Sequence, residues 1–139
     1  MIFPEGGRSP DGWGQDWKPG AAFLALRANT PVVPVFLEGT DRVLPKGASR
    51  PRPDSTTVTF GHPILPAKGD DARRLGARIE KAVGELADEA TTDWWSARRR
   101  AALGTTPSLT GPAGATGWRR DWARTAKRKD RDKPKRSWP

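Results

Sequence analysis

Cysteine is absent from this 139-residue chain, and histidine occurs only once. The lack of cysteine excludes disulfides and thiolate metal sites. No apolar run approaches the roughly 18 residues that a membrane-spanning helix needs. The amino terminus also lacks the basic-then-apolar layout of a signal peptide. We therefore expect neither a membrane-spanning segment nor secretion by a signal of its own.

Apolar residues are also scarce, at 35% of the chain, and 14 prolines and 15 glycines interrupt the pattern. Such a chain can bury one modest core, which we expect within residues 1–90 of a domain that spans residues 1–92. The formal net charge is +9, but residues 118–139 alone contain 10 basic and 3 acidic side chains. The basic character therefore belongs to the carboxyl-terminal tail, and so does any argument from charge about partners.

The expected elements alternate between strands and helices. Met1-Ile2-Phe3 resembles the end of a buried strand, and residues 32–37 and 56–60 are β-prone runs. Pro34, within the first of these runs, predicts an edge position or a bulge there. Residues 20–28 form a short apolar pattern typical of a buried helix packed on a sheet, and residues 70–90 have apolar side chains at helical spacing. The order strand, helix, strand within about 35 residues favours a crossover and at least part of a parallel sheet. We predict an α/β fold with a partial mixed sheet flanked by helices.

Beyond residue 92 the composition changes. Residues 93–104, with Trp94-Trp95 and Arg98-Arg99-Arg100, indicate a short basic helix, and residues 105–117 are typical of a linker. We expect the basic tail at 118–139 to be largely disordered.

The turn after the first predicted strand has the residue types of a phosphate site. Gly6 and Gly7 let the backbone approach a ligand closely, and Arg8 offers a planar fork of donors that suits a phosphate. Glu5 could hold Arg8 in place or accept a hydrogen bond from a substrate hydroxyl. Lys18, before a predicted helix start, is a further candidate contact. On these residues alone, a purely structural turn remains the commoner alternative.

The string Phe3-Pro4-Glu5-Gly6-Gly7-Arg8-Ser9 resembles the Phe-Pro-Glu-Gly-Thr-Arg-Ser block of the 1-acylglycerol-3-phosphate acyltransferases. Further blocks are similar to that family in the same order, namely Lys18-Pro19-Gly20-Ala21-Ala22, Thr30-Pro31-Val32-Val33-Pro34-Val35, Phe36-Leu37-Glu38-Gly39-Thr40 and Val58-Thr59-Phe60-Gly61-His62-Pro63-Ile64. The resemblance covers about residues 1–90. It implies that Glu5, Gly6, Gly7 and Arg8 bind the acceptor phosphate.

Two departures from the family pattern matter. Gly7 stands where threonine is usual, which loosens the loop or removes one hydroxyl donor. The family's catalytic histidine and aspartate, separated by four residues, should precede the phosphate block; here the single histidine is His62, and Ala67 occupies the aspartate position. We assign His62 a structural or surface role and identify no catalytic residue, metal site or cofactor in this chain. The simplest hypothesis is a carboxyl-terminal fragment, inactive alone.

The resemblance implies transfer of an acyl group from acyl-CoA or acyl carrier protein to a glycerol-phosphate or lysophospholipid acceptor in phospholipid synthesis. It also favours a cytoplasmic location with peripheral contact to a membrane. The Trp/Arg/Lys-rich carboxyl-terminal region fits an anionic membrane surface. The alternative is a charged, solvent-exposed tail that has no binding function. Two other functions stay open: a non-catalytic phosphate- or lipid-binding module, and a small basic nucleic-acid-binding protein, the partner we favour least.

Overall fold

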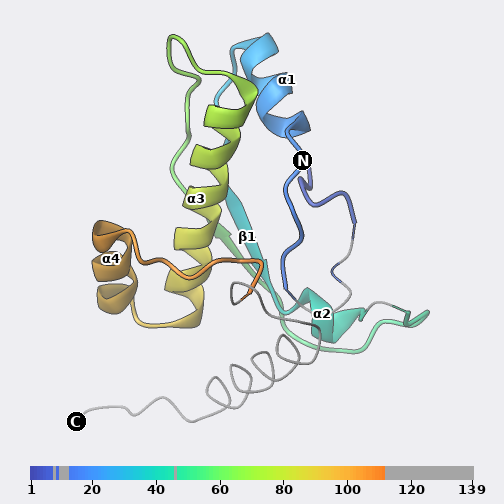
Figure 1. Ribbon diagram of the computed structural model, residues 1–139. Coiled ribbons are helices and arrows are strands. Elements are labelled where there is room, and N and C mark those ends of the chain that lie inside the picture. The colour runs from blue at the N-terminus through green and yellow to red at the C-terminus, as the bar shows by residue number, and fades with distance from the viewer. Residues whose placement is uncertain (8, 10–12, 46, 112–139) are drawn as a thin grey trace.

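A computed structural model of the chain describes residues 1–7, 9, 13–45 and 47–111. Its central element is the long helix α3, Ala72–Thr91, which contacts two other helices and both strands (Figure 1). Helix α1, Gly20–Ala28, packs beside α3, and α4, Trp94–Leu103, follows it after a sharp turn. Helices α1 and α4 therefore both pack on α3, which also contacts the sheet.

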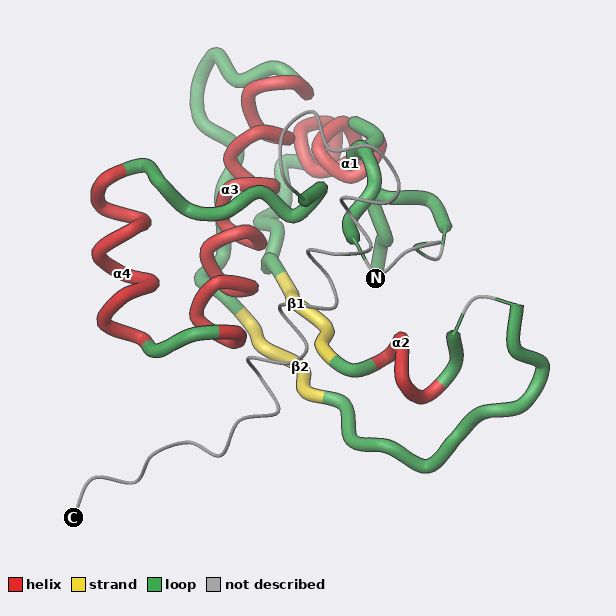
Figure 2. Tube along the Cα trace, turned by 60° about the horizontal axis from the view of Figure 1, so that its bottom comes forward, coloured by secondary structure: helices red, strands yellow, loops and turns green. Residues whose placement is uncertain are grey.

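The sheet of the described residues is a short antiparallel pair. Strand β1, Val35–Glu38, pairs with β2, Thr57–Phe60, and the two are joined by the one-turn helix α2, Thr40–Val43, and a long loop (Figure 2). Since α3 contacts both strands, one face of the pair is covered by that helix. The α/β class predicted from the sequence is confirmed.

Pro34 interrupts the pairing next to β1. The Pro34 carbonyl accepts a hydrogen bond from the Gly61 amide at 2.9 Å, and beyond it Val32 and Ile64 form an isolated antiparallel bridge. Proline has no N–H to donate, so the ladder breaks at that position. The sequence predicted such an irregularity at Pro34.

Two expectations about the sheet are wrong for the described residues. Met1–Phe3 form no strand, and their side chains are 93%, 52% and 62% exposed. The Phe3 carbonyl instead accepts from the Gly6 amide at 3.1 Å, so the backbone turns there and does not run on beside a neighbour. The parallel pairing expected between residues 1–3 and 32–37 is therefore not formed, and the described sheet is antiparallel and not mixed.

The core of the described residues is small and lies between α1 and α3. Ala22 and Ala25 of α1 face Leu75 and Ile79 of α3, and Leu75 is fully buried. Helix α1 has the predicted bounds but not the predicted burial. Its outer side chains, such as Phe23 at 53% exposure, face away because α1 packs on one helix and leaves its far side open.

Helix α3 begins where the sequence predicts. The Asp71 side chain accepts a hydrogen bond from the Arg74 amide at 2.7 Å, which satisfies a backbone N–H that the first turn leaves without a partner. Leu75, Ile79 and Val83 then recur at helical spacing on its buried side.

Candidate functional site

The predicted phosphate motif forms a tight turn that depends on glycine. Pro4 and Glu5 occupy the turn, and Gly6 closes it with φ of +69°. That left-handed conformation is open to glycine at little cost and strained for other residues. Position 6 therefore has a backbone reason to be glycine.

Glu5 fixes the loop that follows the turn. Its carboxylate accepts a hydrogen bond from the Gln15 amide at 2.9 Å, so it joins the start of the loop to its end. The sequence suggested two other roles for Glu5, as a partner of Arg8 or of a substrate hydroxyl. Arg8 lies outside the described residues, and its role stays a prediction.

Lys18 lies against the motif turn. Its amide donates to the Pro4 carbonyl at 2.9 Å, and a Cβ placed on Gly6 would lie only 2.8 Å from the Lys18 Nζ. The ammonium group thus covers Gly6 from one side, whereas a Cβ on Gly7 would meet nothing within 4 Å. The structure brings together four of the five candidate residues: Glu5, Gly6, Gly7 and Lys18.

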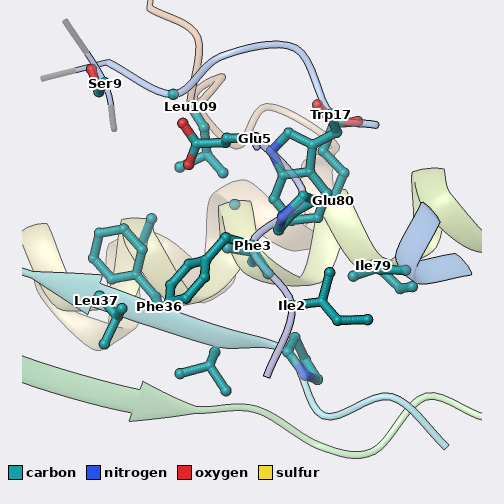
Figure 3. Close-up of a pocket in the computed structure, with 18 of the residues that line it drawn as sticks. Ile2, Phe3, Glu5, Ser9, Trp17, Phe36, Leu37, Ile79, Glu80 and Leu109 are labelled. Atoms are coloured by element: carbon teal, nitrogen blue, oxygen red, sulfur yellow. The ribbon is translucent and has the colours of Figure 1, made fainter. Parts of the chain in front are cut away.

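The motif borders a large open hollow of about 2960 Å³. Small-molecule sites have volumes of roughly 300–1,000 Å³, so this hollow exceeds what a glycerol phosphate would fill. Figure 3 shows apolar side chains of the amino-terminal segment, β1 and α3 around it, with Glu5 and Ser9 at the motif side. Its lining includes Ile2, Phe3, Glu5, Gly7, Ser9, Lys18, Phe36, Leu37 and Ile79.

Residues after α4 return to support the motif loop. The Gly14 amide donates to the Leu109 carbonyl at 2.9 Å, and Gly111 approaches the ring of Trp13 so closely that a Cβ there would lie 3.1 Å from it. The Ser9 hydroxyl donates to the Trp13 carbonyl at 2.6 Å. Part of the segment predicted to be a linker therefore packs on the loop, which no sequence pattern indicated.

His62 lies away from this arrangement. It is exposed in the irregular segment after β2 and does not line the hollow. Ala67, five positions later, provides no carboxylate. The chain's single histidine is thus not placed to act beside the motif.

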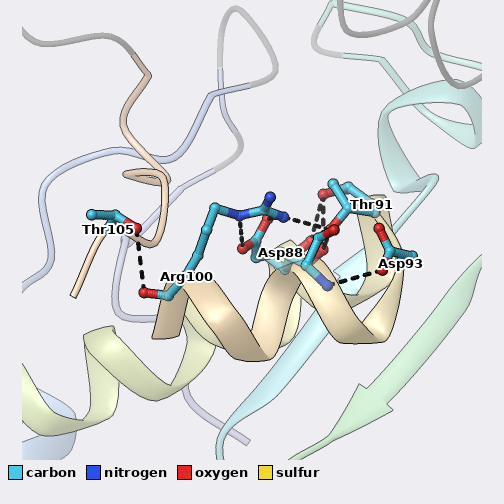
Figure 4. A network of polar contacts seen from close by, with 8 residues as sticks. Asp88, Thr91, Asp93, Arg100 and Thr105 are labelled. Carbon is cyan, nitrogen blue, oxygen red and sulfur yellow. Dashed lines mark hydrogen bonds and ion pairs between the residues drawn. The ribbon is translucent and has the colours of Figure 1, made fainter. Parts of the chain in front are cut away.

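The sequence missed a buried ion pair between α3 and α4. Asp88 is 5% exposed and accepts two hydrogen bonds from Arg100, at 2.7 Å from Nε and 2.8 Å from Nη2 (Figure 4). These bonds raise the pKa of Arg100 above its ordinary value. Arg98 instead pairs with Glu89 at 3.0 Å, so the three consecutive arginines do not form one uniform basic patch.

Asp93 caps α4 in the same region. Its carboxylate accepts from the Ser96 amide at 2.9 Å, and this bond lowers the pKa of Asp93 below its ordinary value of 3.8. Together with the Asp88–Arg100 pair, the cap fixes where α4 begins and how it lies on α3.

Two further predictions concern what the chain does not contain. Across the ranges that the structure describes, no helix is both long enough and apolar enough to cross a bilayer. In the same ranges, no group of three or more acidic or histidine side chains could hold a metal ion. The tail at 118–139 lies outside the described residues, and its expected disorder stays a prediction.

Comparison with known proteins finds acyltransferases, in agreement with the resemblance of the sequence motifs. The sequence model of the family described as Acyltransferase matches residues 1–38. A 1-acyl-sn-glycerol-3-phosphate acyltransferase of Limnanthes alba is 44% identical over 64 residues, which are 46% of this chain and 23% of that protein. The enzyme of the same name from Cocos nucifera is 41% identical over 71 residues, 51% of this chain and 22% of the relative.

A solved structure supports the same assignment. The crystal structure of the 1-acyl-sn-glycerophosphate (LPA) acyltransferase PlsC from Thermotoga maritima superposes with a TM-score of 0.60 and 30% sequence identity. The match covers 67% of this chain and 39% of that one, so the chain spans under a quarter of the two plant relatives and well under half of the solved structure. The chain is thus similar in sequence and in structure to part of the 1-acylglycerol-3-phosphate acyltransferases, as its motifs predicted.

Proposed function

We propose that this chain forms the acceptor-binding part of an enzyme that transfers an acyl group to a glycerol-phosphate hydroxyl in phospholipid synthesis. The observation that supports this most directly is the position of the Lys18 ammonium against the Gly6 turn. A cation held beside an open glycine backbone suits a phosphate monoester, which accepts hydrogen bonds from both.

The residues of the motif then have distinct tasks. Lys18 and Arg8 neutralise the acceptor phosphate, and Gly7, with open space beside it, lets the ligand approach the backbone. Glu5 keeps the loop closed through the Gln15 amide and so acts as a positioning residue. The acceptor is a glycerol phosphate or lysophospholipid, and the donor is acyl-CoA or acyl carrier protein.

The reaction needs a base that the described residues do not place at the motif. The acceptor hydroxyl attacks the thioester carbonyl, the carbon–sulfur bond breaks, and the hydroxyl proton must pass to a base and on to the leaving thiol. A positioned base typically contributes about 10²–10⁴-fold. We therefore propose that polypeptide beyond these 139 residues supplies a histidine–aspartate pair, and that the chain alone is inactive.

The hollow is where we place that additional polypeptide. Met1, Ile2 and Phe3 are exposed at its edge, while Phe36 and Leu37 of β1 are only half-buried. Covering this apolar surface with further strands would remove it from water, a gain of about 25 cal/mol per Å². We propose a cytoplasmic location with peripheral membrane contact for the complete enzyme, whose acceptor is a lipid.

Acceptor binding can be tested on the chain itself. Calorimetric titration with glycerol 3-phosphate should give binding that glycerol does not, because only the phosphate meets the two cations. Arg8→Ala and Lys18→Ala should each weaken it by roughly 10- to 100-fold, the range for a charge-assisted hydrogen bond. Lys68→Ala, an exposed lysine outside the hollow's lining, is the matched control.

The catalytic half of the proposal has its own test. Acyl transfer should be absent from the chain alone and appear when the upstream histidine–aspartate region of a related acyltransferase is fused before Met1. Equal binding of glycerol and glycerol 3-phosphate would contradict the acceptor site. A second candidate, a non-catalytic phosphate-binding module, is favoured by the position of His62 outside the hollow, and it predicts binding without any activity in the fusion.

A further inference from the structure

Helix α4 presents an unusual exposed surface. Trp94 and Trp95 are 58% and 75% exposed, and their rings stack with centroids 5.3 Å apart and planes 13° apart. Adjacent exposed indoles are uncommon on a soluble surface, where large apolar patches mark interaction sites.

Two of the three arginines of α4, Arg98 and Arg99, lie on the same side of the helix as the tryptophans. The Arg98 guanidinium lies 5.7 Å from the centroid of the Trp94 ring, and Arg99 is one turn beyond Trp95 and exposed. The opposite side of the helix contains the buried Ala97. We call Trp94, Trp95, Arg98 and Arg99 the α4 face.

The α4 face is held rigidly. On the inward side of the helix, Arg100 makes two bonds to the buried Asp88 and a third to the Thr92 hydroxyl at 2.7 Å (Figure 4). The Asp93 cap fixes the first turn. The helix that bears the two exposed indoles is thus already fixed in position, so binding requires no further loss of its conformational entropy.

We propose that the α4 face docks on the headgroup region of an anionic phospholipid bilayer. Indole rings favour the membrane–water interface, and each arginine near an anionic lipid surface adds about a fivefold gain in binding. The charge of the α4 face is complementary to anionic lipid through Arg99, whose side chain is exposed there. This proposal rests on the proposed function, because a lipid acceptor must be taken from a bilayer.

The position of the face fits that task. Thr91 and Thr92, directly before α4, line the hollow that also reaches the phosphate motif. Docking through α4 would therefore bring Thr91 and Thr92, which line the hollow, close to the lipid surface. A single-stranded nucleic acid fits less well, because it stacks bases on open aromatic faces, and the Trp94 ring is already in contact with Trp95 and Arg98.

Vesicle co-sedimentation of the full chain tests the proposal. The probes are phosphatidylcholine vesicles with and without phosphatidylserine. We expect binding to the mixed vesicles, a loss of roughly tenfold or more in Trp94→Ser/Trp95→Ser, and about a fivefold loss in Arg99→Gln. Phe60→Ser, which removes a 69% exposed aromatic from β2, and Arg50→Gln, an exposed loop arginine, should leave binding unchanged.

Three results would overturn the proposal: no binding of the wild type to mixed vesicles, unchanged binding of the tryptophan double variant, or an equal loss in both controls. Preferential loss of oligonucleotide binding in the double variant would point to nucleic acid instead. Circular dichroism of each variant separates lost binding from lost folding. Glycerol 3-phosphate titration of the double variant should match the wild type, and Arg8→Ala should still bind vesicles, so this inference and the acceptor site fail separately.

Discussion

Leu75 is the side chain on which the packing of α1 against α3 depends most. It is fully buried, and the residues that face it from α1, Ala22 and Ala25, have the shortest side chains that can form a core. Because alanines cannot extend into a vacated space, Leu75→Ala should leave a cavity that its neighbours do not fill.

The cost follows from the atoms removed. Three carbons are lost, at about 0.8 kcal/mol each, which gives about 2.4 kcal/mol before any cavity contribution. Partial approach of α1 to α3 limits the cavity, so we expect about 3 kcal/mol in total, within the 2–5 kcal/mol usual for such changes. The buried apolar side chains of the described residues are four alanines with Leu75, Ile79 and Val83. With so small a core, total stability should lie near the low end of about 5–15 kcal/mol, and the variant would lose about half of it.

Urea unfolding followed by far-ultraviolet circular dichroism measures the difference. The midpoint should fall while the slope of free energy against urea stays constant, since the surface exposed on unfolding hardly changes. Leu65→Ala is the matched control, because Leu65 is 63% exposed and should cost under about 1 kcal/mol. A loss in Leu75→Ala no larger than in this control would refute the assignment of the core.

Two further predictions concern the turn and the α4 cap. Gly6→Ala should lower the free energy of unfolding by about 1–2 kcal/mol, because alanine is strained in the left-handed backbone, and should weaken glycerol 3-phosphate binding by displacing the Lys18 ammonium. Gly7→Ala should lower the free energy of unfolding less, as measured in urea. Equal losses of stability in the two variants would contradict the role of the Gly6 backbone. The lowered pKa of Asp93 contributes stability above pH 3.8 that disappears as the pH falls through the lower folded-state pKa. Asparagine can cap the helix but does not titrate, so the thermal midpoint of Asp93→Asn should fall less than that of the wild type between about pH 6 and about pH 3. An equal fall of the midpoint in both proteins would exclude Asp93 as a source of the pH dependence.

Local patterns predicted much of the secondary structure. The spacing of Leu75, Ile79 and Val83 indicated α3, and the position of Pro34 indicated a break beside β1. Both depend on residues close in sequence, where helical periodicity and the missing proline N–H act directly.

Features that depend on distant contacts could not be predicted in this way. The pairing of Arg100 with Asp88 requires the angle between α3 and α4, and the sequence showed only a basic run. The approach of Lys18 to Gly6 requires the intervening loop to fold back, which the Glu5–Gln15 bond accomplishes. Motif matching identified these site residues, but the role of Glu5 in closing the loop became visible only in three dimensions.

The central position of α3 has a consequence for how the molecule opens. Because α1, α4, β1 and β2 all contact this one helix, unwinding of α3 removes the surface that they share and leaves the two strands paired only with each other. Amide protons in the middle of α3 should therefore exchange with solvent only through global unfolding, while α2 and the loop beyond it can open locally. The phosphate motif and the α4 face lie near opposite ends of the described chain, but they belong to one cooperative unit. Both should therefore lose their structure when α3 unfolds.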